Sequence, residues 1–304
     1  MRDSGGRAVS LAILFLAAVS ATAADPPSRA AFDPGAVPWT RLEFEAKKLW
    51  ATGTTEVRLG SAEGGDLDRQ LIASPRGTAL RPGVPRLTVL AMNAAFAGRR
   101  SETSVWFDPQ RSTAFQRLKR RIGKKGYQKT YRYGEDGVYV LRRAPLDARQ
   151  GEGPVDGWGK IEEFFYPYPQ ERPDCVTVSD PSLLLYLVAA AGPGDPFSVC
   201  TFSGKTLFLV EFKPRGTTSL AVDYVTRSQG QESRRQGDVE AACVVLEARP
   251  VEAVEGEDFE FLGLEGDVEI FLDGRIPVAV EGRLPGLGKL RIQLAAADLL
   301  ASAP

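Results

Sequence analysis

Residues 115–133 read FQRLKRRIGKKGYQKTYRY and contain eight Lys or Arg side chains. The GKKG segment at 123–126 places glycines where a tight turn needs them, so two antiparallel strands joined by a hairpin turn are predicted. Successive side chains of a strand point to opposite faces, which makes one face of this hairpin cationic and aromatic. That face consists of Phe115, Arg117, Lys119, Arg121, Tyr127, Lys129, Tyr131 and Tyr133.

Arg and Lys next to Tyr suit contacts with phosphate-rich surfaces. We therefore interpret this face as a candidate site for anionic cell-envelope material, such as lipid head groups or the phosphates of lipopolysaccharide. The tentative ligand-binding residues are Arg117, Lys119, Arg121, Tyr127, Lys129 and Tyr131. The alternative is a solvated outer face whose lysines guard a sheet edge, partly neutralised by the acidic run EAVEGEDFE at 252–260.

The chain contains no His, which excludes Ser-His-Asp triads, Cys-His dyads and His-ligated metal sites. No GxSxG, CxxC or calcium-loop pattern occurs. The SGKT segment at 203–206 resembles the end of a phosphate-binding loop, but Val199 stands where that loop needs Gly. Its flanks also look like two strands. We therefore expect no catalytic residues, no metal, no cofactor and no enzymatic activity.

Without His, any catalysis would rest on carboxylates, Tyr, Lys, Ser or Cys, and the alternative we consider is a pair of carboxylates. Glu162 and Glu163 are neighbours in a predicted strand and point to opposite faces, whereas Asp267 and Glu269 share a face. A pair of carboxylates across a cleft could serve a hydrolase acting on cell-envelope polysaccharide. Loss of turnover on replacing Asp267, Glu269 or Asp273 would identify that activity.

Three cysteines, Cys175, Cys200 and Cys243, allow three disulfide pairings and leave one thiol over. In an oxidising compartment a disulfide is expected. We favour Cys175–Cys200, because these residues bracket a compact strand-helix-strand segment while Cys243 lies in a separate strand pattern. The alternative is that all three are small buried side chains. The sequence does not assign a role to Cys243.

The N-terminus has the features of a secretory signal peptide. Arg2 and Arg7 precede an apolar run, and small residues lead to a cleavage site after Ala23. We expect residues 1–23 to be removed, 24–37 to be a flexible leader, and 38–304 to be a single β-rich domain in the periplasm. The net charge changes from −1 to −2 on cleavage, which with the secretory route argues against a nucleic-acid partner. No later segment is long enough to span a membrane.

Short alternating segments separated by glycine turns predict a mainly β fold. We expect one large curved antiparallel sheet, or a half-open barrel, around one buried helix at 180–192. Asp180 is the predicted N-cap, Pro181 opens the helix, and Gly192 ends it. The polar segment TRSQGQESRRQG at 226–237 is predicted to be a loop.

Two segments carry a resemblance to a known family. They are VSDPSLLLYLVAAAGPGDPFSVCTFSGKTLFLVEFKPRG (178–216) and GDVEIFLDGRIPVAVEGRLPGLGKLRIQL (266–294). Together they resemble the periplasmic Gram-negative proteins grouped as domain of unknown function thirty-one-oh-eight and their close relatives. The matching residues are Asp180, Pro181, Asp273, Pro277 and Gly288, which turn and cap chemistry also explains. The resemblance implies a secreted antiparallel β-domain with no established activity.

A curved sheet of this kind can hold an apolar ligand. The leading hypothesis is therefore a non-enzymatic periplasmic protein that binds or chaperones a lipid, a lipoprotein or an anionic envelope polymer such as lipopolysaccharide. The alternatives are a structural or protein-interaction domain with a filled core, and the carboxylate-dependent hydrolase. The sequence does not show whether the sheet encloses a cavity.

Overall fold

The structure is a computed structural model that describes residues 32–48, 51–96, 98–123, 126–172, 174–252 and 258–301. The predicted signal peptide and most of the predicted leader lie outside these residues. Residues 32–37, which we had placed in the leader, are folded. A 3-10 turn, η1 (Pro34–Ala36), follows Asp33, whose backbone N–H donates to the carbonyl of Ala190. Val37 is buried, so the flexible leader does not extend to residue 37.

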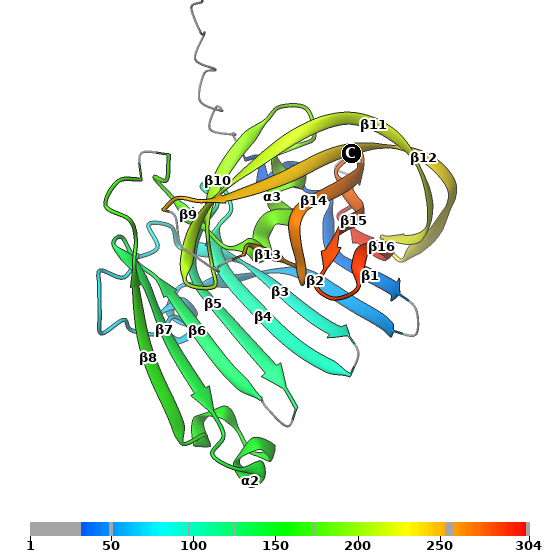
Figure 1. Ribbon diagram of the computed structural model, residues 1–304. Helices are drawn as coiled ribbons and strands as arrows, with labels where there is room; N and C mark the ends of the chain where they lie inside the picture. Colours follow the sequence, from blue (N-terminus) through cyan, green and yellow to red (C-terminus); the bar gives the residue numbers. More distant parts are fainter. Residues whose placement is uncertain are drawn as a thin grey trace, which may run out of the picture.

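The described residues form one large, mainly antiparallel sheet of sixteen strands (Figure 1). The first eight strands pair in chain order, each antiparallel to the next. They are β1 (Trp39–Lys48), β2 (Ala51–Glu63), β3 (Arg86–Phe96), β4 (Arg99–Asp108), β5 (Thr113–Ile122), β6 (Tyr127–Tyr133), β7 (Gly137–Ala144) and β8 (Lys160–Pro167). This confirms the predicted mainly β class and the hairpin turns between short strands.

The second half of the chain continues the same sheet. Its strands are β9 (Val178–Ser179), β10 (Phe197–Ser203), β11 (Thr206–Ser228), β12 (Gln231–Pro250), β13 (Glu260–Phe261), β14 (Leu264–Asp273), β15 (Ile276–Leu284) and β16 (Gly288–Leu299). Strand β16 returns to pair with β1, which joins the two halves. Two short pairings, β9 with β10 and β11 with β16, are parallel, which the sequence did not predict.

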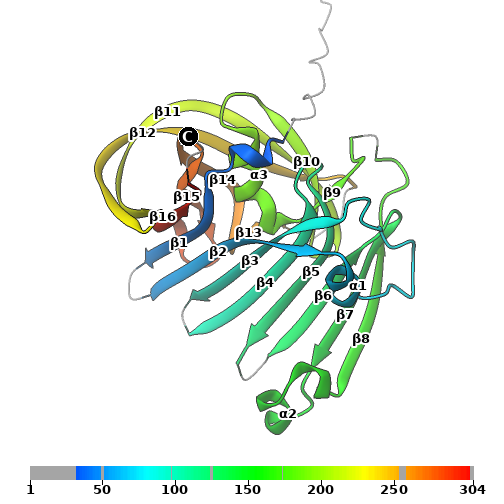
Figure 2. The same cartoon turned by 180° about the vertical axis from the view of Figure 1, so that it is seen from behind.

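Strands β11, β12, β14, β15 and β16 close into a ring (Figures 1 and 2). The pairing of β11 with β12 shifts register between Pro214 and Thr217, where Gly216 has φ of +86°. A bulge of this kind bends a strand pair. The hairpin therefore curves until Val225 reaches the level of Ala296 on β16.

The predicted loop at 226–237 is instead the tip of this β11–β12 hairpin. Its residues are polar because the tip extends beyond the core, and residues 229–237 are exposed. The strands of the tip could not be predicted from alternating apolar and polar residues, because neither face of the tip is buried and its sequence is polar throughout.

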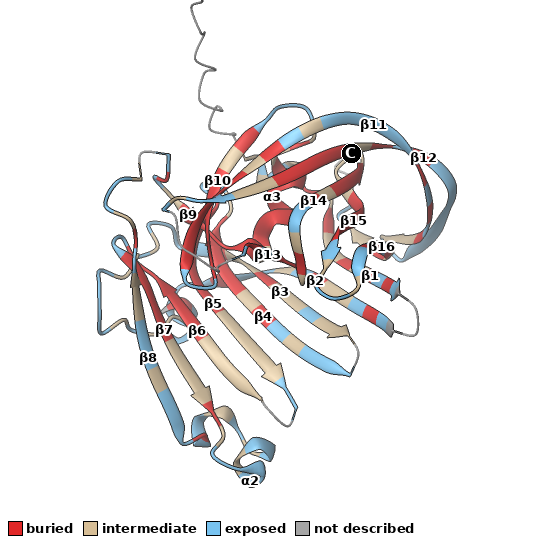
Figure 3. Cartoon of the chain, viewed as in Figure 1, coloured by how far each residue is buried: buried red, intermediate tan, exposed pale blue. Residues whose placement is uncertain are grey.

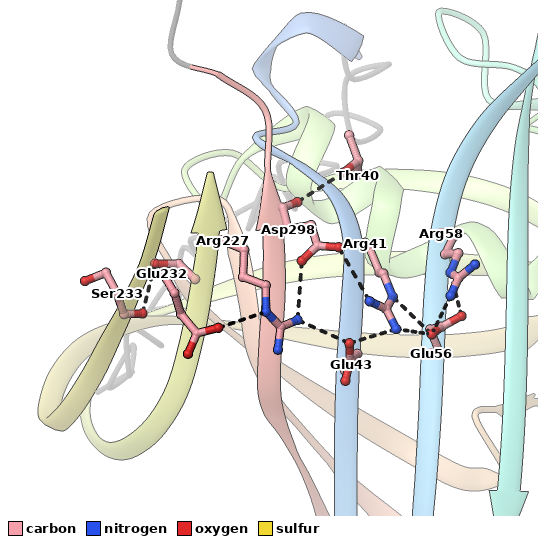
Figure 4. Close-up of polar contacts among 10 residues, drawn as sticks. Thr40, Arg41, Glu43, Glu56, Arg58, Arg227, Glu232, Ser233 and Asp298 are labelled. Carbon is pink, nitrogen blue, oxygen red and sulfur yellow. Dashed lines mark hydrogen bonds and ion pairs between the residues drawn. The ribbon is translucent and has the colours of Figure 1, made fainter. Parts of the chain in front are cut away.

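An ion-pair network holds the ring closed (Figure 4). Arg227 on β11 lies 3.4 Å from Glu43 on β1 and 3.5 Å from Asp298 on β16, and it also contacts Glu232 on β12. Arg41 extends the network on β1, because its guanidinium contacts Glu43, Glu56 and Asp298.

The buried helix lies inside the curve of the sheet, as predicted. Asp180 accepts from the N–H of Ser182 and begins η3 (Pro181–Leu183), which runs into α3 (Leu184–Ala191), and Gly192 ends it. Residues 184–190 are all buried, because this segment is apolar on every side and contacts both halves of the sheet. Arg275 donates to the carbonyls of Ala189 and Ala190 at its C-terminal end.

Three short surface elements were not predicted. Helix α1 (Gly65–Gln70) lies on the outer face of the sheet (Figure 2), while α2 (Ala148–Glu152) and the 3-10 turn η2 (Val155–Gly157) lie between β7 and β8. Their lengths are too short for a helical period to show in the sequence. Within the described part of the chain, none of the helices has the length and apolarity needed to cross a membrane.

Candidate functional site

The cationic hairpin forms as predicted from β5 and β6. Three cross-strand pairs define its face, namely Arg117 with Tyr131, Lys119 with Lys129, and Arg121 with Tyr127. The turn residues 124 and 125 lie outside the described residues. In this register the six predicted side chains lie on the same face of the hairpin.

Phe115 does not belong to that face. The pairing of β4 with β5 shifts register between Trp106 and Phe107, which inserts an extra residue into β5. Phe115 consequently packs with Leu87 and Trp106 in a separate small cluster. Simple alternation cannot anticipate a bulge, and it was wrong for this residue.

The cationic face points inward, toward the concave side of the sheet. The β5–β6 hairpin lies between β4 and β7, so it covers no sheet edge, and the edge-guard interpretation was wrong. Burial decreases along these strands from the end that meets α3 toward the hairpin tips (Figure 3). Lys119 and Lys129 are half-buried at the transition, rather than fully solvated.

A pocket of about 370 Å³ opens over this face. Five of the six predicted ligand-binding residues line it: Arg117, Lys119, Tyr127, Lys129 and Tyr131. Arg121 is not among the lining residues, although its cross-strand partner Tyr127 is. The structure therefore brings together most of the site that side-chain alternation predicted.

The remaining walls of the pocket come from distant parts of the chain. Strands β2, β3 and β4 supply Thr55, Met92, Ala94, Ser101 and Thr103. The start of η3, the β10–β11 turn and the region of β13 supply Pro181, Ser182, Ser203, Gly204, Glu260, Phe261, Leu262 and Gly263. Only long-range contacts assemble these walls, and no sequence pattern links them. The lining is thus cationic and aromatic on one side and partly apolar on the other.

A buried ion pair forms the deep end of the pocket. The Arg117 guanidinium lies 2.9 Å from the carboxylate of Asp180 and 3.8 Å above the ring of Tyr131. Tyr133 donates its hydroxyl to the same carboxylate at 2.5 Å. Burial is the largest single influence and would lower the pKa of Arg117, but the charge of Asp180 together with Tyr133 and Tyr131 outweighs it and raises that pKa. Burial, and then the charge of Asp180, raise the pKa of Tyr133 well above its usual value, so the phenol stays protonated and donates.

The two lysines nearer to the opening differ from this ion pair. Among the described residues, neither Lys119 nor Lys129 has a carboxylate partner within ion-pair distance. Lys129 lies 5.6 Å from the ring centre of Tyr127, and the neighbouring Arg142 is engaged by Glu162. The lysines face each other as a cross-strand pair, an arrangement that places like charges side by side.

The acidic run at 252–260 does not neutralise these lysines in the part that the structure describes. Residues 253–257 lie outside the described residues. Glu260 lines the far wall of the pocket, and no ion pair joins it to Lys119 or Lys129.

Asp273, Pro277 and Gly288, the other residues singled out from the sequence, lie outside the pocket and take part in packing, ion pairing or turns. Asp273 contacts Arg235 at 2.6 Å and accepts from the Tyr224 hydroxyl at 2.9 Å, so it does more than form a turn. Pro277 is buried in β15 opposite Leu272, and Gly288 has φ of +76° where β16 begins.

The predicted disulfide is present between Cys175 and Cys200, and it ties the segment before β9 to β10. Cys243 is a buried free thiol. Burial, and secondarily the charge of Glu269, raise the pKa of the Cys243 thiol. A raised pKa lowers the thiolate fraction, so Cys243 is a poor nucleophile in the folded chain.

The carboxylates considered for hydrolysis are mostly held by cations. Arg142 binds Glu162 and lowers its pKa, and Glu269 lies 3.0 Å from Arg215. Asp267 is exposed on the same strand as Glu269. In the described part of the chain, no group of three or more His, Cys, Asp or Glu side chains is placed to hold a metal ion.

A second hollow, of about 430 Å³, lies over β1–β4. Its carboxylates include Glu43 and Glu56, which are already paired with Arg41, and Arg58 also contacts Glu56. Most of the carboxylates of this hollow are therefore already paired with cations, whereas Lys119 and Lys129 of the other pocket have no carboxylate partner among the described residues.

The fold and the pocket together define a β-rich protein with a concave, cation-lined pocket on a curved sheet. Comparisons with protein-family models, with curated proteins and with solved structures give no match for this chain.

Proposed function

We propose that this chain is an exported, non-enzymatic protein of the periplasm that binds an amphipathic, anionic component of the cell envelope. A lipid, a lipoprotein or lipopolysaccharide would meet this description. Membership of the family that the sequence resembles is part of the same proposal, and it would be consistent with a secreted β-domain.

One observation carries the proposal: Lys119 and Lys129 line a pocket that also has apolar lining residues, and neither lysine has an ion-pair partner in the described part of the chain. Half-buried cations without partners are costly unless something compensates them. The opposite wall contains Met92, Phe261 and Leu262, which suit an acyl chain. An anionic head group with an apolar tail would satisfy both sides at once.

A structural or interaction domain remains the second candidate, because α3 already fills the deepest part of the curved sheet. In that case the pocket would hold only water. The hydrolase alternative has less support, since Glu162, Glu269 and Asp273 are each held in an ion pair with an arginine, and the pKa of Glu162 is lowered by Arg142, which makes it a poor general acid.

Native mass spectrometry of protein purified gently from a periplasm tests the proposal. We expect a lipid-sized adduct on the wild type. Ala94→Phe should remove the adduct by filling the pocket, because Ala94 lines it. Ala95→Phe is the matched control, since Ala95 is the next residue on β3 and does not line this pocket. A clean apo mass for the wild type would favour the structural role.

A further inference from the structure

The cationic face has a regular order along β5 and β6. A lysine pair, Lys119 with Lys129, lies between two pairs that each combine an arginine with a tyrosine. Directly opposed residues on adjacent antiparallel strands have Cβ atoms about 5 Å apart. Both ammonium groups can therefore reach one small anion above the sheet.

The charges around the pocket are unevenly compensated. Asp180 neutralises Arg117 at the deep end, and Glu162 engages Arg142 at the side. Within the described ranges, Lys119 and Lys129 have no carboxylate partner, and the one carboxylate that lines the same pocket is that of Glu260 on the far wall. A ligand group carrying close to two negative charges would match the lysine pair, whereas a carboxylate carries only one.

Hydrogen-bond donors surround the same position. Tyr127 and Tyr131 line the pocket beside the lysines. The Nε atom of Arg117 is buried and has no hydrogen-bond acceptor among the described residues. An unsatisfied buried donor is uncommon in folded proteins and calls for a partner. A phosphate group offers several acceptor oxygens, which a single carboxylate does not.

We infer that the Lys119–Lys129 pair holds a phosphate monoester, the head group of the amphipathic ligand. Lys is a frequent phosphate ligand that acts as a point charge, and a phosphate monoester carries about −1.5 to −2 charges at neutral pH. This inference rests on the proposed function, because the apolar wall is assigned to the chain of the same ligand. Beyond the proposed function, the inference specifies that the head group of the ligand is a phosphate monoester.

Titration calorimetry with three lipids that share one acyl chain tests the head group. The probes are a lysophosphatidic acid, the matching fatty acid and the matching monoacylglycerol, each below its micelle concentration. We expect the lysophosphatidic acid to bind about tenfold more tightly than the fatty acid, from one additional charge-assisted contact. Monoacylglycerol should bind most weakly.

Substitutions identify the residues. Lys119→Gln and Lys129→Gln should each weaken lysophosphatidic acid binding about tenfold and leave monoacylglycerol binding unchanged. Lys47→Gln is the matched control, because Lys47 is an exposed lysine on β1 outside the pocket. Glu260→Gln should change the affinity in the opposite direction and tighten binding of lysophosphatidic acid, because the substitution removes the negative charge on the far wall of the pocket.

A thermal melt separates loss of binding from loss of folding. Removing one member of a like-charged cross-strand pair relieves repulsion, so Lys119→Gln should keep or raise the melting temperature. Binding loss without a lower melting temperature supports a ligand role. Loss of binding that follows a lower melting temperature in both lysine variants would overturn it.

The outcomes distinguish the two proposals. Equal binding of the lysophosphatidic acid and the fatty acid, both tighter than that of the monoacylglycerol, overturns the phosphate inference and leaves the proposed anionic, amphipathic ligand standing. Binding of none of them overturns both. Inorganic phosphate that binds as tightly as the lysophosphatidic acid, with the same sensitivity to Lys119→Gln, would assign the pair to free phosphate and overturn the lipid assignment.

Discussion

At the residue scale, the pocket contains a buried, ion-paired arginine and two half-buried lysines, and side-chain alternation in the sequence does not distinguish between them. Arg117 is buried against Asp180 and Tyr133, and its charge is used to hold the start of η3 against β5. Lys119, two residues later, is half-buried and lacks an ion-pair partner among the described residues. Position relative to the buried helix decides whether a cation on this strand pairs with Asp180 or, among the described residues, has no ion-pair partner.

The buried pair predicts a strong dependence of stability on Asp180. Asp180→Asn should lower the free energy of unfolding by about 3 to 5 kcal/mol, because it leaves a buried arginine without a counter-charge. Arg117→Met should have a similar effect, and the double variant should lose less than the sum. Urea unfolding of the four proteins measures this coupling.

Asp223 provides the control for this experiment. It pairs with Arg234 through two hydrogen bonds of 2.7 Å, but both side chains are exposed on the β11–β12 hairpin. Asp223→Asn should therefore change stability little. Equal losses at Asp180 and Asp223 would contradict the view that burial makes the first pair essential.

At the scale of elements, the β11–β12 hairpin is the least local part of the fold. It leaves the core, curves at the bulge near Gly216, and returns to meet β16 over only three residue pairs. So short a parallel contact contributes few hydrogen bonds. The ion pair of Arg227 with Asp298 on β16 reinforces this contact directly, and the ion pair of Arg227 with Glu43 ties it to a third strand, β1 (Figure 4).

Arg227→Gln should loosen this closure without unfolding the sheet. We expect amide hydrogen exchange at 225–227 and 296–298 to become roughly threefold faster, since exposed ion pairs contribute modestly and act locally. Arg234→Gln is the control, because Arg234 pairs within the hairpin and bridges nothing to β1. Unchanged exchange in Arg227→Gln would mean that backbone pairing alone closes the ring.

At the scale of the whole molecule, one hydrophobic core joins both halves of the chain. The same cluster contains Leu42 and Leu90 from the first half, Leu187 from α3, and Val245 and Ile292 from the second half. Helix α3 therefore acts as the centre around which both halves pack. From this shared core we expect the chain to unfold as one cooperative unit, so the predicted single domain over 38–304 stays a prediction for the following experiment.

Leu187→Ala should lower the free energy of unfolding by about 3 kcal/mol, because it opens a cavity in a fully buried site. Leu146→Ala is the control at an exposed leucine and should change stability by less than about 0.5 kcal/mol. All four tryptophans precede β8, so their fluorescence reports mainly on the β1–β8 part of the sheet, whereas far-ultraviolet circular dichroism reports on the whole chain. Coinciding transitions in urea support one unit, and separate transitions would indicate two.

Local sequence patterns were sufficient to predict elements that have a clear alternation of side chains or clear capping residues. Alternation predicted the β5–β6 hairpin and which of its side chains lie together, and capping residues Asp180 and Gly192 predicted the helix to within a residue or two. These predictions hold because they depend on contacts close in sequence. Two of them failed at irregularities: the bulge that turns Phe115 away, and the polar hairpin tip at 226–237 that no apolar period marks.

The sequence by itself determined the β class, the buried helix, the Cys175–Cys200 pairing and the set of cations and tyrosines on one strand face. Only the tertiary structure decided that this face points inward, that five of its residues line a pocket, and that Arg117 is neutralised while Lys119 and Lys129 are not. The physical reason is that the pocket walls and the carboxylate of Asp180 come from segments far apart along the chain. Their approach is set by packing around α3 and by the closure of the sheet, which no local pattern encodes.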